Sequence, residues 1–125
     1  MSSFKGFFKF LFQKREPIII RVEIHDDGFT TYREDNFVEY FRWNEINFIC
    51  TYKVDCYTYD MIWLGFVLQD EREIQIREET KGFADFSSKV SETFLSIDKQ
   101  WYFKVQLPPF AENFTILFER EKIIA

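Results

Sequence analysis

The stretch MIWLGFVLQDEREIQIRE, residues 61–78, decides the fold class of this chain. Its first part, 61–68, is apolar, and in its second part, 73–78, isoleucines alternate with polar residues as they do on a β-strand. The polar residues 69–72 predict a turn, so the stretch predicts an antiparallel hairpin. One face of the hairpin is expected to be apolar and to consist of Ile62, Leu64, Phe66, Leu68, Ile74 and Ile76.

The two-residue period predicts further strands on both sides of this hairpin. Short strands are expected before it at 18–25, 29–33, 37–42 and 46–53, and after it at 114–119. The sequences Asp26-Asp27-Gly28 and Glu34-Asp35-Asn36 predict the turns between the first three strands, with a positive φ at the glycine. One face of the fourth strand is expected to hold Ile46, Phe48, Cys50 and Tyr52.

A helical period replaces the strand period at 83–97. Apolar residues step by three or four positions and form one stripe: Phe83, Phe86, Val90, Phe94 and Ile97. The first four residues of this stripe are expected to pack on Ile20, Val22, Phe48, Leu64, Phe66 and Ile74. Residues 101–107 are expected to be a strand or an extended linker. The predicted fold is α+β: a single domain over 1–125, with six to eight antiparallel strands in a bent sheet or partly closed barrel, covered by one main helix.

The N-terminal segment, residues 1–15, differs from the rest of the chain in charge. It contains four basic residues and no acidic one, whereas the remainder carries a net charge of −9. A short helix is predicted at 4–14, with Phe4, Phe7, Phe8 and Leu11 on one face. We interpret this face as an interface helix that packs on the sheet or on a second copy of the chain, in preference to a weak contact with a membrane surface.

Bulk composition narrows the classes of protein further. The chain has 125 residues, 46% hydrophobic and 30% charged, which is typical of one globular domain. A net charge of −5 argues against nucleic-acid binding, which depends on clustered lysines and arginines, and it suits a basic protein partner. The apolar run 7–12 contains Lys9 and has no small-residue cleavage site, so we expect no signal peptide. The two cysteines are expected to be reduced, and the cytoplasm is the expected location.

Residues that could carry catalysis are few. His25 is the single histidine, and Asp26 and Asp27 beside it are expected to stabilise a turn, because a metal site needs three or four converging ligands. Cys50 falls at an apolar position of a strand, where a buried structural thiol is expected. The sequence has no Gly-x-Ser-x-Gly elbow, no Cys-x-x-Cys pair and no Gly-rich phosphate loop. We therefore predict a non-catalytic protein without metal or cofactor.

The predicted loop at 52–60 combines aromatic and acidic residues. Its sequence is Tyr-Lys-Val-Asp-Cys-Tyr-Thr-Tyr-Asp, and it joins two predicted strands. Binding residues often lie on such connections, and tyrosine is common among the residues that dominate interface energetics. The predicted partner-binding residues are Tyr52, Asp55, Tyr57, Tyr59 and Asp60.

A series of short motifs from Trp43 onward resembles a known family. The motifs are Trp43-Asn44-Glu45-Ile46, Tyr52-Lys53-x-Asp55, Asp60-x-Ile62-x-Leu64, Glu78-Glu79, Gly82-Phe83, Trp101, Pro108-Pro109-Phe110, Asn113-Phe114-Thr115 and Arg120. Together they resemble small, uncharacterised bacterial proteins with a pleckstrin-homology-like fold. A pleckstrin-like module ends on its capping helix, whereas this chain is expected to add a strand. Phosphoinositide binding does not carry over, because the first turn is Asp26-Asp27-Gly28 instead of a basic cluster.

These patterns favour binding over chemistry. The leading hypothesis is a non-catalytic protein-binding module that presents acidic and aromatic surface to a basic partner. Some small proteins that resemble this chain are immunity partners of bacterial toxins, so a toxin is one candidate for that partner. The alternative hypothesis is a carrier of a small apolar ligand, with an aromatic pocket between sheet and helix.

Overall fold

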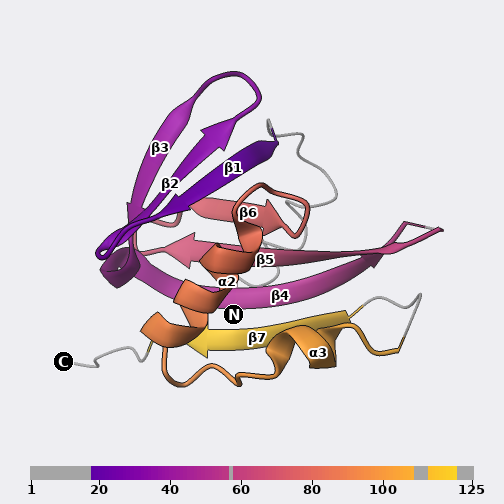
Figure 1. The fold of residues 1–125 in the computed structure, drawn as a ribbon. Coiled ribbons are helices and arrows are strands. Elements are labelled where there is room, and N and C mark those ends of the chain that lie inside the picture. Colours follow the sequence, from indigo (N-terminus) through magenta and orange to yellow (C-terminus); the bar gives the residue numbers. More distant parts are fainter. Residues whose placement is uncertain (1–17, 57, 109–112, 121–125) are drawn as a thin grey trace.

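A computed structural model describes residues 18–56, 58–108 and 113–120 of the chain (Figure 1). The predicted N-terminal helix at 4–14 and the predicted binding residue Tyr57 lie outside these ranges. The described strands are β1 (Ile19–Ile24), β2 (Gly28–Arg33), β3 (Val38–Arg42), β4 (Ile46–Asp55), β5 (Asp60–Leu68), β6 (Glu73–Arg77) and β7 (Asn113–Glu119). The described helices are the 3-10 helix η1 (Trp43–Glu45), α2 (Phe83–Thr93) and α3 (Trp101–Val105).

The strands form two antiparallel sheets, which confirms the α+β class. The first sheet has the order β1-β2-β3, and the second has the order β6-β5-β4-β7. The prediction of one bent sheet or partly closed barrel was wrong in this respect, since the two sheets are separate. The chain leaves the first sheet at η1, a single turn that interrupts the strand period between β3 and β4. An isolated bridge between Arg21 and Lys81 links β1 to the turn after β6.

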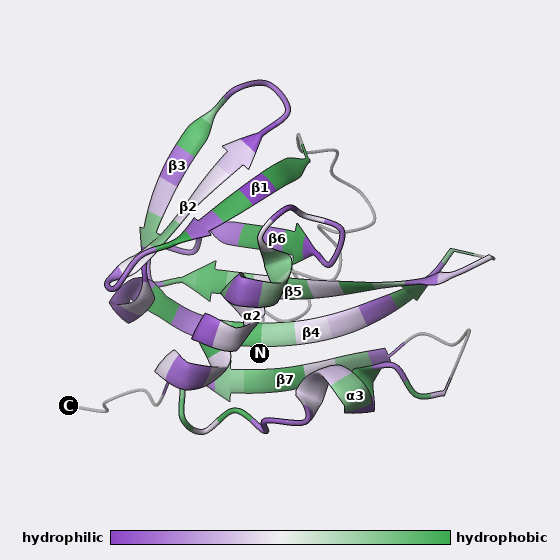
Figure 2. Ribbon diagram, viewed as in Figure 1, coloured by the Kyte–Doolittle hydropathy of each residue, from purple (hydrophilic) through white to green (hydrophobic). Residues whose placement is uncertain are grey.

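The hairpin predicted at 61–78 is confirmed as β5 and β6. Leu64 pairs with Ile76 and Phe66 pairs with Ile74, and the turn closes where the Leu68 amide donates to the Arg72 carbonyl at 2.9 Å. Hydrophobic residues run along most of β5 (Figure 2). All six residues of the predicted apolar face are buried in the core.

The predicted stripe on the helix is also buried, although the helix is shorter than predicted. Helix α2 ends at Thr93, and Phe94 has left the helical region of the backbone with φ −105° and ψ 88°. Phe94 and Ile97 nevertheless remain in the core. The helix begins after Gly82, whose φ is +90° and whose hypothetical Cβ would lie 2.4 Å from the Val22 carbonyl oxygen. A side chain at Gly82 would therefore be strained and would push α2 away from β1.

Two β-bulges correct the predicted packing of this stripe. In β1 the register shifts between Ile19 and Arg21, so Ile19 faces the core and Ile20 is 50% exposed. In β4 the register shifts between Ile46 and Phe48, so Ile46 joins the core while Phe48 faces the other side of the sheet. A bulge adds one residue to a strand and so reverses the alternation beyond it, which a strict two-residue period does not anticipate.

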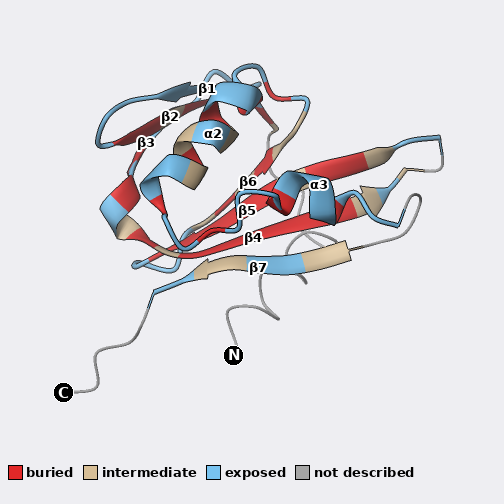
Figure 3. Cartoon of the chain, turned by 60° about the horizontal axis from the view of Figure 1, so that its bottom comes forward, coloured by how far each residue is buried: buried red, intermediate tan, exposed pale blue. Residues whose placement is uncertain are grey.

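The core lies between the two sheets and the helices. Helix α2 packs beside β1, and α3 packs on β4 and β7 (Figures 1 and 3). The Phe86 ring lies 4.9 Å from the Phe29 ring and 5.6 Å from the Phe66 ring, both edge to face. Residues 101–107 were predicted to be extended, but α3 is a helix because Trp101 and Val105, four positions apart, share the face that is buried in this core.

Gly28 is required for a reason other than the one the sequence predicted. Among the glycines that the structure describes, Gly82 has the positive φ, and Gly28 does not. A Cβ at Gly28 would lie 1.9 Å from the Phe41 carbonyl oxygen. The residue is therefore needed for the close approach of β2 to β3.

Candidate binding surface

Three of the residues predicted to bind a partner lie together at the end of the β4–β5 hairpin. Asp55 and Asp60 are cross-strand partners in the last pair of the ladder, and the loop is closed where the Cys56 amide donates to the Tyr59 carbonyl at 2.8 Å. Tyr59 is 49% exposed. This hairpin extends beyond the neighbouring strands at the right of Figure 1. The end of the hairpin therefore presents two carboxylates and a phenol.

Lys53 holds one of these carboxylates from below. Its ammonium group lies 3.7 Å from an Asp60 oxygen, and the Lys53 side chain is fully buried. The same ammonium group donates to the Gln106 carbonyl at 2.8 Å and to the Pro108 carbonyl. A buried lysine is stable only when its donors are matched, and here they bind two backbone oxygens and a carboxylate. Lys53 therefore ties the end of β4 to the segment after α3.

Tyr52, which was also predicted to bind a partner, lies on the side of the sheet opposite to Lys53. Its ring stacks between Trp63, at 5.9 Å and 10°, and Phe114, at 6.4 Å and 12°. Burial raises the pKa of its phenol well above 10. The structure thus places Tyr52 within a cluster of buried side chains and apart from Asp55, Tyr59 and Asp60.

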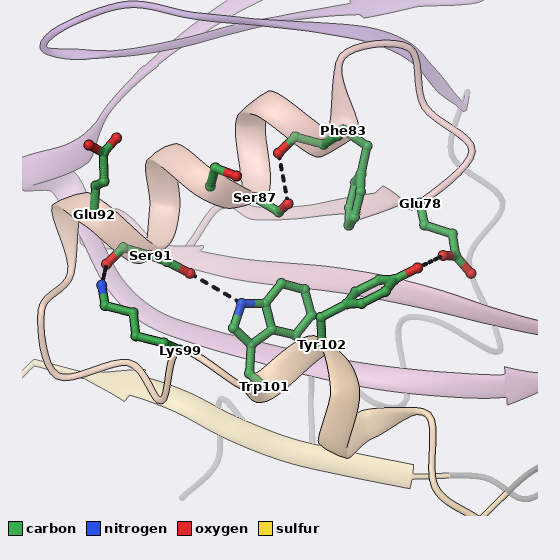
Figure 4. Close-up of a pocket in the computed structure, with 10 residues that line it drawn as sticks. Glu78, Phe83, Ser87, Ser91, Glu92, Lys99, Trp101 and Tyr102 are labelled. Carbon is green, nitrogen blue, oxygen red and sulfur yellow. Dashed lines mark hydrogen bonds between the residues drawn. The ribbon is translucent and has the colours of Figure 1, made fainter.

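The turn after β6 adds two carboxylates that the predicted site did not include. The Glu78 amide donates to the Ile62 carbonyl at 2.9 Å, and the Ile62 amide donates to a Glu78 carboxylate oxygen at 3.2 Å. The other Glu78 oxygen accepts a hydrogen bond of 2.6 Å from the Tyr102 hydroxyl (Figure 4). That bond raises the pKa of Tyr102 to about 12, because it favours the protonated phenol. Glu78 thus joins β5 to α3.

Glu79 follows Glu78 in the turn after β6, and its side chain is exposed. The electrostatic effect of Cys56, and next that of Glu79, raises the pKa of the exposed Tyr59 in the hairpin. Arg77, at the end of β6, acts on Tyr59 in the opposite direction and more weakly. The end of the β4–β5 hairpin, the turn after β6, and α3 therefore contribute to one surface. We call it the acidic–aromatic surface, and its residues are Asp55, Tyr59, Asp60, Glu78, Glu79 and Tyr102.

A groove between α2 and α3 continues from this surface (Figure 4). It encloses about 740 Å³, and Glu78 and Tyr102 belong both to the groove and to the acidic–aromatic surface. The Trp101 indole forms one wall and donates to the Ser91 hydroxyl at 3.2 Å. Lys99, in the loop before α3, donates to the Ser91 carbonyl, so this loop is also bound to α2 at the far end of the groove. The groove combines aromatic walls with hydroxyl and carboxylate groups.

The residues that the sequence singled out for chemistry are dispersed. His25 lies on the three-stranded sheet, where its Nε2 is 2.9 Å from the Thr30 hydroxyl, and Asp27 accepts a hydrogen bond from Tyr40. Cys50 is a free, buried thiol in the middle of the other sheet, and burial raises its pKa to about 12. Within 18–56, 58–108 and 113–120, no three His, Cys, Asp or Glu side chains are grouped so that they could hold a metal ion. In the same ranges, no helix is long and apolar enough to cross a membrane.

No protein-family model, no curated protein and no solved structure matches this chain. The resemblance to pleckstrin-homology-like proteins therefore stays a prediction. The acidic–aromatic surface and the groove are the features of the described residues that point to a function.

Proposed function

We propose that the protein is a non-catalytic protein-binding module that binds a basic partner through its acidic–aromatic surface. The observation that supports this proposal is the convergence of four carboxylates and two tyrosines from β4–β5, the turn after β6, and α3. Clustered carboxylates attract a basic partner over a distance, and exposed tyrosines supply contact area at small entropic cost. The groove beside Tyr102 offers a place for a side chain of that partner.

A toxin neutralised by a small acidic immunity protein is one partner of this kind. The acidity of residues 16–125 and the position of the carboxylates are compatible with that role. The protein encoded next to this chain is the first partner to examine, because toxins and their immunity proteins are commonly encoded together. Binding should weaken as salt is added, since the surface acts through charge.

The test compares two double variants in calorimetric titrations with that neighbouring protein. Tyr59→Ala with Glu79→Gln removes one ring and one charge from the surface. Tyr40→Ala with Glu71→Gln removes the same groups elsewhere, at positions that are also exposed. We expect the first variant to raise Kd by at least about tenfold, equivalent to ~1.4 kcal/mol, and the second to leave Kd unchanged. Equal Kd values for both variants and the unmodified chain would show that the partner binds elsewhere.

The groove supports a second candidate function, the binding of a small ligand. The space between the sheets and α2 is filled by aromatic rings such as Phe29, Phe66 and Phe86, so the groove between α2 and α3 is the better place for such a ligand. Its volume lies within the range of ordinary ligand pockets, ~300–1,000 Å³. The two functions can be separated with Ala84→Trp, which fills the groove and leaves the carboxylates of the hairpin in place.

A further inference from the structure

The face of the four-stranded sheet that points away from α2 and α3 carries a second apolar cluster. Its buried members are Phe48, Cys50, Tyr52 and Val67, and Val54, Trp63 and Phe114 pack against them. We call these seven residues the outer face. No described helix contributes to this cluster, because the buried residues of α2 and α3 all belong to the main core.

Four residues of the outer face, Phe48, Cys50, Tyr52 and Val67, are buried as deeply as core residues, and the other three are partly buried. Cys50 is 0% exposed and Tyr52 is 2% exposed. Figure 3 shows β4 and β5 buried along most of their length, although α2 and α3 lie on a single side of their sheet. A sheet face that is open to water carries alternating exposed residues, whereas strands covered on both faces are apolar along their length, as β5 is after Asp60. The outer face therefore needs a covering layer.

We propose that the N-terminal segment 4–14 is that layer and that its face of Phe4, Phe7, Phe8 and Leu11 packs on the outer face. Its composition fits, because five phenylalanines and one leucine fall within residues 4–12. The other stretches outside the described ranges are short: residue 57 alone, 109–112 and 121–125. Neither of the two longer ones reaches two helical turns, so neither can form a helix with an apolar face of four residues.

The described chain begins at a place from which the segment 4–14 can reach the outer face. The Lys81 amide donates to the Ile20 carbonyl at 3.1 Å, and the Thr80 hydroxyl donates to the Ile19 carbonyl at 3.2 Å. The start of β1 therefore lies beside the turn that follows β6, at one edge of the four-stranded sheet. From there a segment must cross three strand spacings, ~14 Å, and an 11-residue helix is ~16 Å long. The predicted helix is long enough to cover the sheet.

The charge of the N-terminal segment is complementary to that at the edges of the outer face. Residues 1–15 carry four positive charges and no negative one. Glu73 pairs with Val67, and Glu119 pairs with Phe48, so both carboxylates lie at the edges of the outer face. Basic side chains on the flanks of the segment would therefore meet acidic residues on both edge strands.

A spin label placed on the segment tests its position in the full-length chain. The label is attached at Lys9→Cys in a Cys50→Ala, Cys56→Ser background, and the three indole N–H signals are observed by NMR. Trp63 belongs to the outer face, whereas Trp43 and Trp101 belong to the main core and serve as internal controls. We expect the label to broaden the Trp63 signal far more than the other two. Equal broadening of all three indoles would overturn the proposal.

Mixing experiments separate this arrangement from the other possible occupants. A spin-labelled chain without ¹⁵N is mixed with an unlabelled ¹⁵N chain, and we expect the Trp63 signal of the mixture to stay sharp. Broadening in the mixture would show that a second copy covers the face, and so would overturn the proposal. Sedimentation of the chain with anionic phosphatidylglycerol vesicles, together with an unbroadened Trp63 signal, would assign the segment to a membrane instead.

Cys50 provides an independent measurement, since its thiol is buried in the outer face. In a Cys56→Ser background, Phe7→Asp with Phe8→Asp should detach the segment and accelerate labelling of Cys50 by a maleimide by about tenfold or more. Phe103→Asp places the same charge at an exposed phenylalanine of α3 and should leave the rate unchanged. A folded Phe7→Asp, Phe8→Asp variant whose Cys50 reacts at the unmodified rate would contradict the inference.

Discussion

Replacing Phe86 with alanine would remove the ring on which both sheets and α2 converge. Phe86 is 0% exposed and lies on the buried face of α2. Its ring meets Phe29 of the first sheet at 4.9 Å and Phe66 of the second at 5.6 Å, edge to face in both cases. It also stacks on Trp43 of η1 at 6.1 Å. The substitution therefore tests whether the two sheets share one core.

The size of the effect follows from these contacts. A buried Phe→Ala substitution costs ~3–5 kcal/mol, through lost transfer free energy and the cavity that remains. Aromatic pairs with edge-to-face geometry contribute ~0.5–1.5 kcal/mol each beyond burial, and Phe86 makes two. We therefore expect a loss of ~4–5 kcal/mol in the free energy of unfolding. With an unfolding entropy of ~0.26 kcal/mol/K for a chain of this length, Tm should fall by ~15–20 °C.

Thermal and urea unfolding, followed by circular dichroism at pH 7, measure this loss. Phe103→Ala is the matched control, because Phe103 is 65% exposed, and its free energy of unfolding should change by less than ~0.5 kcal/mol. Phe86→Asp should abolish the cooperative transition, since it also buries a charge. A Phe86→Ala variant within ~1 kcal/mol of the unmodified chain would refute the shared core.

Two further predictions concern polar contacts between elements. Lys53→Met should lower the free energy of unfolding by ~3 kcal/mol in urea titrations, because it leaves the Gln106 and Pro108 carbonyls without their buried donor. An unchanged urea midpoint would mean that the methionine packs well enough to replace the ammonium group. Tyr102 has a pKa of about 12 in the folded chain, above its ordinary value of 10.0, because it donates to Glu78. Its contribution to stability is therefore complete below pH 10 and is lost as the pH rises through 12, and Tyr102→Phe should make stability less dependent on pH in that interval. Glu78→Gln should lower the pKa of Tyr102 in an absorbance titration, and an unaltered titration would contradict this account.

The sequence by itself determined which segments are strands and where most of them lie. The expected strand at 61–68 corresponds to β5 at Asp60–Leu68, and the one at 114–119 corresponds to β7 at Asn113–Glu119. Strands can be predicted from sequence because apolar residues that recur with a two-residue period indicate one buried face. This pattern depends only on residues that are close together in the sequence. The buried face of α2 could be predicted for the same reason, although Phe94 and Ile97, the last residues of the predicted stripe, lie beyond the end of the helix.

The candidate surface could be predicted only in part. Asp55, Tyr59 and Asp60 lie within six residues of one another in the sequence, so a loop rich in acidic and aromatic residues was enough to indicate them. The sequence marked Glu78 and Glu79 only as one of the short motifs of the resemblance, without a predicted role in binding. Tyr102 gave no signal, because its place beside Glu78 depends on α3 folding back across the sheet. A site assembled from three elements carries no local pattern.

Tertiary structure alone decided the side of the sheet to which each residue of β4 points and the separation into two sheets. A bulge of one residue after Ile46 turns Phe48, Cys50 and Tyr52 away from the main core. The alternation of residues within β4 favours Phe48, Cys50 and Tyr52 as core residues, because the other side of the strand holds polar residues such as Thr51 and Lys53. The composition of the strand by itself therefore predicts the wrong side. The choice depends on how whole elements pack, because α2 and α3 can cover only one face of the sheet, and the bulge sets which residues that face presents.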